Sequence, residues 1–221
     1  MRKYPEFKKY KRNKLDVNEK QISIFVNSIY QKNNKIIRKN LDLYKKSWAK
    51  LGKDYFVLVS QIFGDYKWPL GKYIVYLTIW GMHPRFLEDK TFQIPFRHKN
   101  EKYINVIIAH EMLHFIFYDY FYNKFPQYKS NKYNFFVWNI SEIFNNIAQD
   151  SPQWIKIFKA KSMPYPEHKK IVNKLKKKFY KKSVIIAKDL IKEIIKNKDF
   201  LPIFAGLTFG VRYAYINIIK G

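Results

Sequence analysis

Residues 107–117 read IIAHEMLHFIF, a run of large apolar side chains that is interrupted by two histidines and a glutamate. On an α-helix, His110 and His114 lie on one face about one turn apart, because they are four positions apart. Glu111 is rotated by about 100° from His110 and flanks the pair. Three polar groups among apolar neighbours are costly to bury unless they have partners. Both imidazoles reach one ion in this arrangement, so the sequence predicts a metal site on a buried helix.

A metal site of this kind needs a third protein ligand and an open position for water. The helix that carries the motif is expected between Asn100 and Phe125, and a second helical pattern runs from Val137 to Ala148. That second helix carries Glu142, which is the first candidate for the third ligand. Two rivals stay open. Asp119 lies about 140° round the helix from His114, and Asp150 stands at a helix end.

HExxH followed some tens of residues later by a helical glutamate resembles the gluzincin metallopeptidases, including their minimal single-domain forms, over residues 73–150. The resemblance implies a zinc-dependent metallopeptidase acting on a peptide or protein substrate. Zn²⁺ would be held by His110, His114 and Glu142 and would activate a water molecule, with Glu111 as general base. Gluzincins commonly orient a zinc-bound histidine from the position four residues after the third ligand. Asn146 occupies that position here and is expected to orient a zinc-bound histidine by accepting its N–H.

The same resemblance implies two further elements of a peptidase site. A group that stabilises the oxyanion is expected from downstream or from an edge strand, and Tyr213 is the candidate, with Arg212 and His98 as alternatives. The substrate is expected to pair as an added strand along Thr91, Phe92, Gln93 and Ile94. Pro95 favours an edge position for this segment, since proline cannot donate a ladder hydrogen bond.

The rest of the chain gives a coarse architecture. Amphipathic helices are expected over residues 17–50, broken near Asn33 and ended by Gly52. β-Branched and aromatic runs at 55–62 and 73–80 predict a hairpin, and Lys-rich helices are expected over 167–181 and 183–197. The expected fold class is α+β: a small, mostly antiparallel sheet packed on the buried HExxH helix, with helical flanks at both ends.

The charge is concentrated in those flanks. The 221 residues carry a formal net charge of +26. Residues 1–50 contain 15 basic and 4 acidic side chains (+11), residues 51–152 contain 11 and 9 (+2), and residues 153–221 contain 17 and 4 (+13). We expect a catalytic core in the nearly neutral middle between two basic helical flanks. Polyanion contact through these lysines gives the alternative function, a nucleic-acid- or ribosome-associated protein with a structural or degenerate metal site.

Composition limits the remaining possibilities. The chain has no cysteine, which excludes disulfides and cysteine-ligated zinc. The basic start of the chain lacks the apolar run of a signal peptide. The longest uncharged stretch within 200–219 is only about a dozen residues, short of the roughly 20 needed to span a bilayer. We therefore expect a cytoplasmic protein, with a membrane-surface peptidase anchored through 200–219 as a further alternative.

Overall fold

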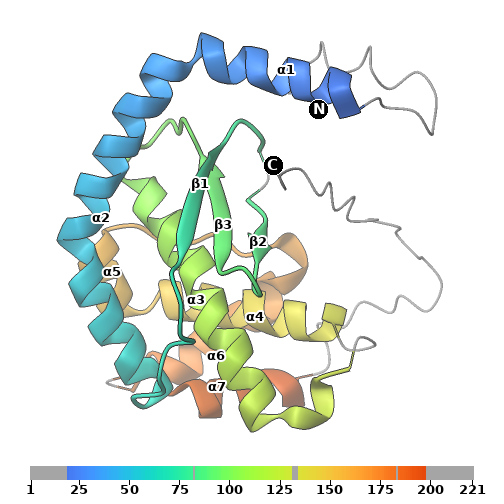
Figure 1. Cartoon of the computed structure of the whole chain (residues 1–221). Coiled ribbons are helices and arrows are strands. Elements are labelled where there is room, and N and C mark those ends of the chain that lie inside the picture. Colours follow the sequence, from blue (N-terminus) through green and yellow to red (C-terminus); the bar gives the residue numbers. More distant parts are fainter. Residues whose placement is uncertain (1–18, 82, 131–133, 183, 198–221) are drawn as a thin grey trace.

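The computed structural model describes residues 19–81, 83–130, 134–182 and 184–197 (Figure 1). In this part of the chain, helices pack against a three-stranded sheet, so the fold is α+β as predicted. The helices are α1 (Glu19–Lys32), α2 (Asn34–Phe63), α3 (Tyr103–Lys124), α4 (Asn134–Gln149), α5 (Pro152–Phe158), α6 (Lys169–Phe179) and α7 (Ala187–Lys196), with short 3₁₀ turns η2 (Pro126–Tyr128) and η4 (Pro166–His168). The strands are β1 (Ile74–Thr78), β2 (Arg85–Phe86) and β3 (Thr91–Pro95).

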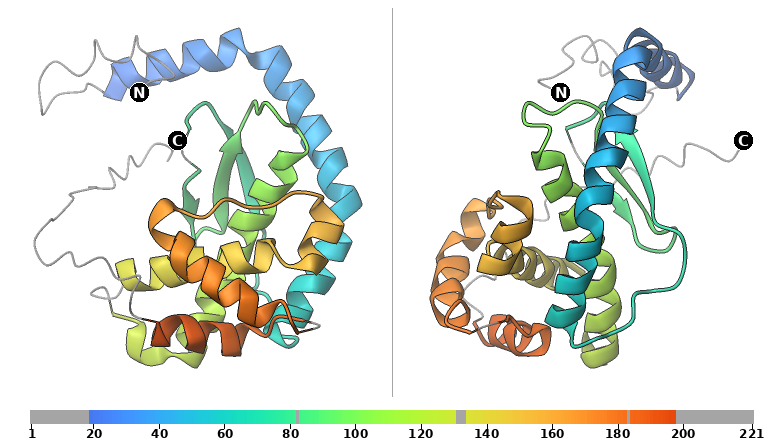
Figure 2. Two further views of the ribbon diagram at one scale, coloured as in Figure 1. Left: turned by 180° about the vertical axis from the view of Figure 1, so that it is seen from behind. Right: turned by 90° about the vertical axis from the view of Figure 1, so that its left-hand side faces the viewer.

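The helices form layers behind the sheet. Strand β3 packs on α3, α3 also contacts α2 and α4, and α4 in turn contacts α6 and α7. Figure 2 shows α2 between the sheet on one side and α5 to α7 on the other. Helix α3 is buried on nearly all sides, in agreement with the apolar character of its sequence. It therefore occupies the centre of the molecule.

The predicted strand at 55–62 is wrong, because these residues form the second half of the 30-residue helix α2. The buried side chains Tyr55, Leu58, Val59 and Ile62 recur at helical spacing and join the core. Gly52 does not end the helix. It lies inside α2, where an added Cβ would stand 3.4 Å from the indole nitrogen of Trp48. The helix ends instead at Gly64, which adopts a left-handed conformation with φ 62°.

The sheet is mixed, and the expectation of a mostly antiparallel sheet is wrong in this respect. The strand order is β1-β3-β2, with β1 parallel to β3 and β2 antiparallel to it. The chain leaves β1, forms β2 on the far side and returns between the two, so β3 is the central strand. The predicted edge position for Thr91, Phe92, Gln93 and Ile94 is therefore wrong. Pro95 is tolerated in this central strand because β2 pairs only with Thr91 and Phe92 and does not extend as far as Pro95.

The Lys-rich C-terminal helices are present as α6 and α7. The expected boundaries of the flanks are not breaks in the structure: 50/51 falls within α2, and 152/153 falls within α5. One hydrophobic core includes residues from α2, α3, α4, α6 and α7. Among the residues that the structure describes, no helix is both long enough and apolar enough to cross a membrane.

Candidate metal centre

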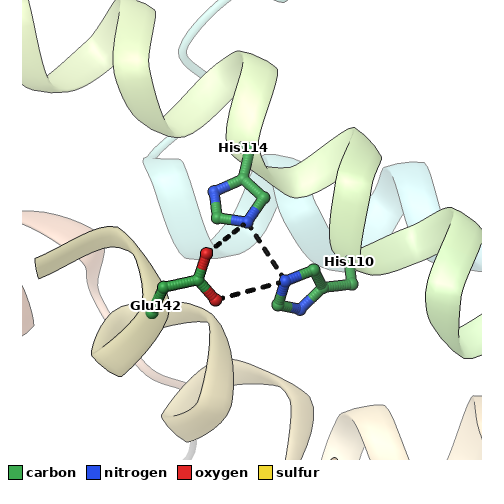
Figure 3. A group of neighbouring side chains, drawn as sticks. All are labelled: His110, His114 and Glu142. Carbon is green, nitrogen blue, oxygen red and sulfur yellow. Dashed lines mark hydrogen bonds and ion pairs between the residues drawn. The ribbon is translucent and has the colours of Figure 1, made fainter. Parts of the chain in front are cut away.

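The three predicted ligands meet where α3 and α4 cross (Figure 3). The Nε2 atoms of His110 and His114 lie 3.1 Å apart. One carboxylate oxygen of Glu142 lies 3.4 Å from Nε2 of His110, and the other lies 3.4 Å from Nε2 of His114. His114 and Glu142 are buried, and His110 keeps 22% of its side chain exposed. The cluster therefore has one partly open side.

These spacings can be compared with those around a tetrahedral ion. Two ligand atoms that each lie about 2.05 Å from one zinc ion are about 3.3 Å apart at the tetrahedral angle. The 3.1 Å between the two imidazole nitrogens is close to that value, and each nitrogen lies 3.4 Å from a different oxygen of Glu142, which is long for a direct hydrogen bond. One ligand atom from each of the three residues lies within 4.8 Å of the other two. Two imidazole nitrogens and a carboxylate oxygen are also a donor set that zinc accepts. The residues thus fit a zinc ion.

The electrostatics of the cluster keep His114 neutral and Glu142 ionised. Burial and, to a smaller extent, the nearby guanidinium of Arg85 lower the pKa of His114 to about 3, so this imidazole is neutral. Burial alone would raise the pKa of Glu142, but the two histidines outweigh it and lower that pKa well below its ordinary value. Burial would lower the pKa of His110, and the contact with Glu142 raises it instead. A neutral imidazole and an ionised carboxylate are the forms that bind metal.

Gln149, not the predicted Asn146, supports a ligand from outside the cluster. Nδ1 of His110 lies 2.8 Å from Oε1 of Gln149, whose amide nitrogen donates to the carbonyl of Val106 at 3.3 Å. Asn146 instead accepts a hydrogen bond from the hydroxyl of Ser162 at 3.0 Å and makes none to either histidine in the described structure. Gln149 replaces it because position 149 lies two turns along α4 from Glu142, on the same face.

His114 has no such support. Its Nδ1 atom is buried without a hydrogen-bond partner among the described residues. Its ring is instead held by packing, 6.1 Å between centroids from the ring of Tyr118. Packing therefore sets the orientation of this ligand, whereas a hydrogen bond sets that of His110.

Both rival ligands lie outside the cluster. Asp119 is exposed and accepts a hydrogen bond from the hydroxyl of Tyr66 at 2.8 Å. Asp150 forms an ion pair with Lys176 and accepts hydrogen bonds from Ser162. In the described part of the chain, His110, His114 and Glu142 are the only group of at least three histidine or carboxylate side chains placed so that they could hold a metal ion. The geometry therefore favours Glu142 as the third ligand.

Glu111 lies beside the cluster and is paired with Arg85, a residue that the sequence reasoning missed. Nη1 of Arg85 is 3.3 Å from Oε2 of Glu111. Nη2 of the same side chain is 3.6 Å from Oε1 of Glu142. Burial raises the pKa of Glu111, and His110 and Arg85 oppose this increase without cancelling it. No spacing in the sequence pointed to Arg85, because it comes from β2, 26 positions before Glu111.

A cleft of about 210 Å³ opens on the exposed side of the cluster. Its walls include His110, Glu111 and Glu142 together with Tyr103, Ile107, Met163 and Tyr165. Met163 and Tyr165 belong to the segment 159–165, which we call the strap. The strap runs from α5 to η4, and the hydroxyl of its Ser162 donates to Asn146 and Asp150. The centre is thus reachable by a ligand from one side.

The other predicted site residues are not brought to the cluster. Tyr213 and Arg212 lie outside the described residues. His98 lies in the loop before α3, where its Nδ1 is 2.7 Å from the carbonyl of Asn100 and its ring stacks on Tyr103. The strand nearest to the ligands is β2, through Arg85.

Comparisons with known protein families, with curated proteins and with solved structures find no match for this chain.

Proposed function

We propose that this chain is a zinc-dependent metallopeptidase that hydrolyses peptide bonds. The observation that carries the proposal is the convergence of His110, His114 and Glu142, whose ligand atoms lie within 4.8 Å of one another, with Glu111 beside them and a cleft in front. A purely structural zinc site is usually closed by four protein ligands. Three ligands, one open side and an adjacent carboxylate are the arrangement expected of a hydrolytic site.

Zinc held by the three ligands would supply Lewis-acid polarisation of the substrate carbonyl and a water molecule of lowered pKa. Glu111 accepts the proton of the attacking water on a carboxylate oxygen while the water oxygen bonds to the carbonyl carbon. The carbon–nitrogen bond then breaks, and Glu111 returns the proton to the leaving nitrogen. Gln149 holds His110 during these steps by accepting the N–H of Nδ1.

Tyr165 is the described candidate for the group that stabilises the negative charge on the carbonyl oxygen. It lines the same cleft as Glu111 and Glu142, and 45% of its surface is exposed. Burial raises the pKa of its hydroxyl, and the charges of Glu142 and Glu111 raise it further. The hydroxyl therefore stays protonated and able to donate at neutral pH. It takes the role that the sequence assigned to Tyr213.

The route of the peptide differs from the one predicted from the sequence. An added strand needs a free sheet edge, and β3 is the central strand. The edge beside the ligands belongs to β2, which holds Arg85 against the centre. We propose that an extended substrate enters the cleft along the outer side of β2, between this strand and the strap.

The decisive test compares wild-type protein with Glu111→Gln in zinc content and in cleavage of an unfolded casein-like substrate. We expect one zinc per chain in both proteins, because Glu111 is not a ligand, and cleavage only by the wild type. Glu101→Gln is the matched control, since Glu101 is an exposed glutamate just before α3. Equal cleavage by wild type and Glu111→Gln, or a chain without bound zinc, would remove the proposal.

Polyanion binding by the Lys-rich flanks stays a prediction. Several lysines of this region are already paired within the molecule, including Lys176 with Asp150 and Lys178 with Glu193. Binding of DNA or RNA by the remaining lysines would weaken steeply between low and physiological salt. Sedimentation with liposomes tests the membrane-surface alternative separately.

A further inference from the structure

Arg85 stands out because its guanidinium bridges two carboxylates that belong to different helices. It pairs with Glu111 of α3 and with Glu142 of α4, at 3.3 and 3.6 Å. Only 15% of its side chain is exposed, and its guanidinium carbon lies 5.8 Å from the centre of the Tyr118 ring. Among the described lysines and arginines, no other side chain pairs with either carboxylate.

The backbone holds Arg85 in this position. It pairs across the sheet with Phe92, which is fully buried on β3, and the N–H of Gln93 donates to the carbonyl of Pro84 at 3.0 Å. The guanidinium thus projects from a paired strand. A planar fork with several donors reaches two acceptors at once, whereas a lysine ammonium acts as a single point charge. The side chain and its anchor are both suited to bridging.

The charge balance shows what the bridge does. Glu111 and Glu142 contribute two negative charges and Arg85 contributes one positive charge, so these three side chains sum to −1. Two carboxylates in one buried site repel each other unless a cation lies between them. A divalent ion among the ligands would supply two more positive charges and change the sum to +1. Arg85 and the ion therefore stabilise the same carboxylates, and they repel each other.

We propose that Arg85 is a built-in counter-cation of the metal centre. It stabilises the paired carboxylates while the ion is absent and weakens the binding of the ion. The metal site is the one on which the proposed function rests, but the inference concerns metal affinity and stability, not hydrolysis. Coupling of this kind is reciprocal, so the ion must also weaken the contribution of Arg85 to stability.

The test measures zinc affinity by competition with a chelator, and the thermal midpoint with and without zinc, for wild type and Arg85→Met. We expect Arg85→Met to bind zinc at least about tenfold more tightly than wild type, which corresponds to about 1.4 kcal/mol. Its metal-free midpoint should be lower than that of wild type, and zinc should reduce this difference. Arg97→Met is the matched control, because Arg97 is exposed just after β3, and it should leave both quantities unchanged.

Two further variants keep the outcome decisive. Arg85→Lys retains the charge and should keep the zinc affinity within about threefold of wild type, with a lower metal-free midpoint. Arg85→Gln retains hydrogen-bond donors without charge and should bind zinc more tightly, which covers a failure of Arg85→Met to fold. Unchanged or weaker zinc binding by both uncharged variants would overturn the inference and make Arg85 a residue that only orients Glu142.

Failure of the proposed function is distinguishable from failure of this inference. If wild type binds no zinc, the peptidase proposal is wrong. The role of Arg85 as a counter-cation is then judged only from the thermal midpoints of the metal-free proteins. A larger drop for Arg85→Met than for Arg97→Met would then support it, and equal midpoints would overturn it. If zinc binds but no peptide is cleaved, the affinity comparison stands unaffected.

Discussion

The Nδ1 atom of His110 lies 2.8 Å from the Oε1 atom of Gln149, and the amide nitrogen of that glutamine is bonded to the carbonyl of Val106. Because the amide nitrogen is already in use, the oxygen faces the imidazole and accepts the proton of Nδ1. The proton is thereby fixed on Nδ1, which leaves the lone pair of Nε2 directed at the cluster. Gln149 thus selects the tautomer that binds metal.

Replacing Gln149 by Leu should lower zinc affinity by about 10- to 100-fold, the usual cost of losing an outer partner of a ligand. Chelator competition measures the change. Asn146→Ala is the matched control on the same helix, and its zinc affinity should stay within a few-fold of wild type because Asn146 is bonded to Ser162 instead. A loss of affinity in Asn146→Ala comparable to that in Gln149→Leu would restore the role that the sequence assigned to Asn146.

Glu142→Gln should lower zinc affinity by more than about 100-fold, since it removes the charge of a direct ligand and not merely an outer partner. Asp119→Asn and Asp150→Asn make the same chemical change at the two rival positions and should leave the affinity unchanged. Either rival variant losing zinc while Glu142→Gln retains it would transfer the third-ligand role to that aspartate.

The metal-free protein should lose stability on acidification through His114. Its folded pKa of about 3 is below the ordinary value of 6.5, so the unfolded chain takes up a proton that the folded chain refuses. The contribution of His114 to the free energy of unfolding is therefore fully present above pH 6.5 and is lost as the pH falls towards 3. The loss amounts to about 1.4 kcal/mol per pH unit well below pH 6.5. His110 has a raised pKa, so its contribution is already constant below pH 6.5.

Urea unfolding at pH 6.0, 5.5 and 5.0, with chelator present, measures this slope. His114→Gln should reduce the slope by about 1 kcal/mol per pH unit in this range. His168 is buried with a lowered pKa and contributes with the same sign, so the difference between wild type and His114→Gln isolates His114. Identical slopes for the two proteins would show that His114 takes up a proton normally in the folded state.

Loss of the Asp150 charge should loosen the strap. Asp150 accepts hydrogen bonds from the N–H and the hydroxyl of Ser162, at 2.7 and 3.2 Å, and pairs with Lys176 of α6. We expect Asp150→Asn to lower the free energy of unfolding by about 1–3 kcal/mol. Backbone amides of 160–165 should also exchange faster with deuterium. Asp54→Asn, at an exposed position of α2, should change neither quantity.

The sequence predicted the grouping of His110, His114 and Glu142 better than the strand topology. The HExxH spacing and Glu142 are local helical patterns, and a helix face is fixed by its own geometry. Arg85 reaches the cluster only through the pairing of β2 with β3, which depends on contacts remote in sequence. No local periodicity carries that information, so this residue could not have been found from the sequence.

The error at 55–62 has a different origin. Tyr55, Val59 and Ile62 have high strand propensity, and this preference outweighed the spacing of three and four that also marks a helix. In the structure, the tertiary packing of that face decides the outcome: Tyr55 donates a hydrogen bond to the carbonyl of Ala109 at 3.3 Å on the motif helix. Propensity was thus overridden by burial against α3.

Because α2 is continuous across residues 50 and 51, the chain cannot be cut at this point without breaking a helix. The half of the helix before this point carries six of the 15 basic residues of 1–50, whereas the half after it supplies Tyr55, Leu58, Val59 and Ile62 to the shared interior. Excision of residues 51–152 would begin in mid-helix and would strip α6 and α7 from α4. Residues 51–152 are therefore not a transplantable module, and chimaeras or truncations should join outside 34–196.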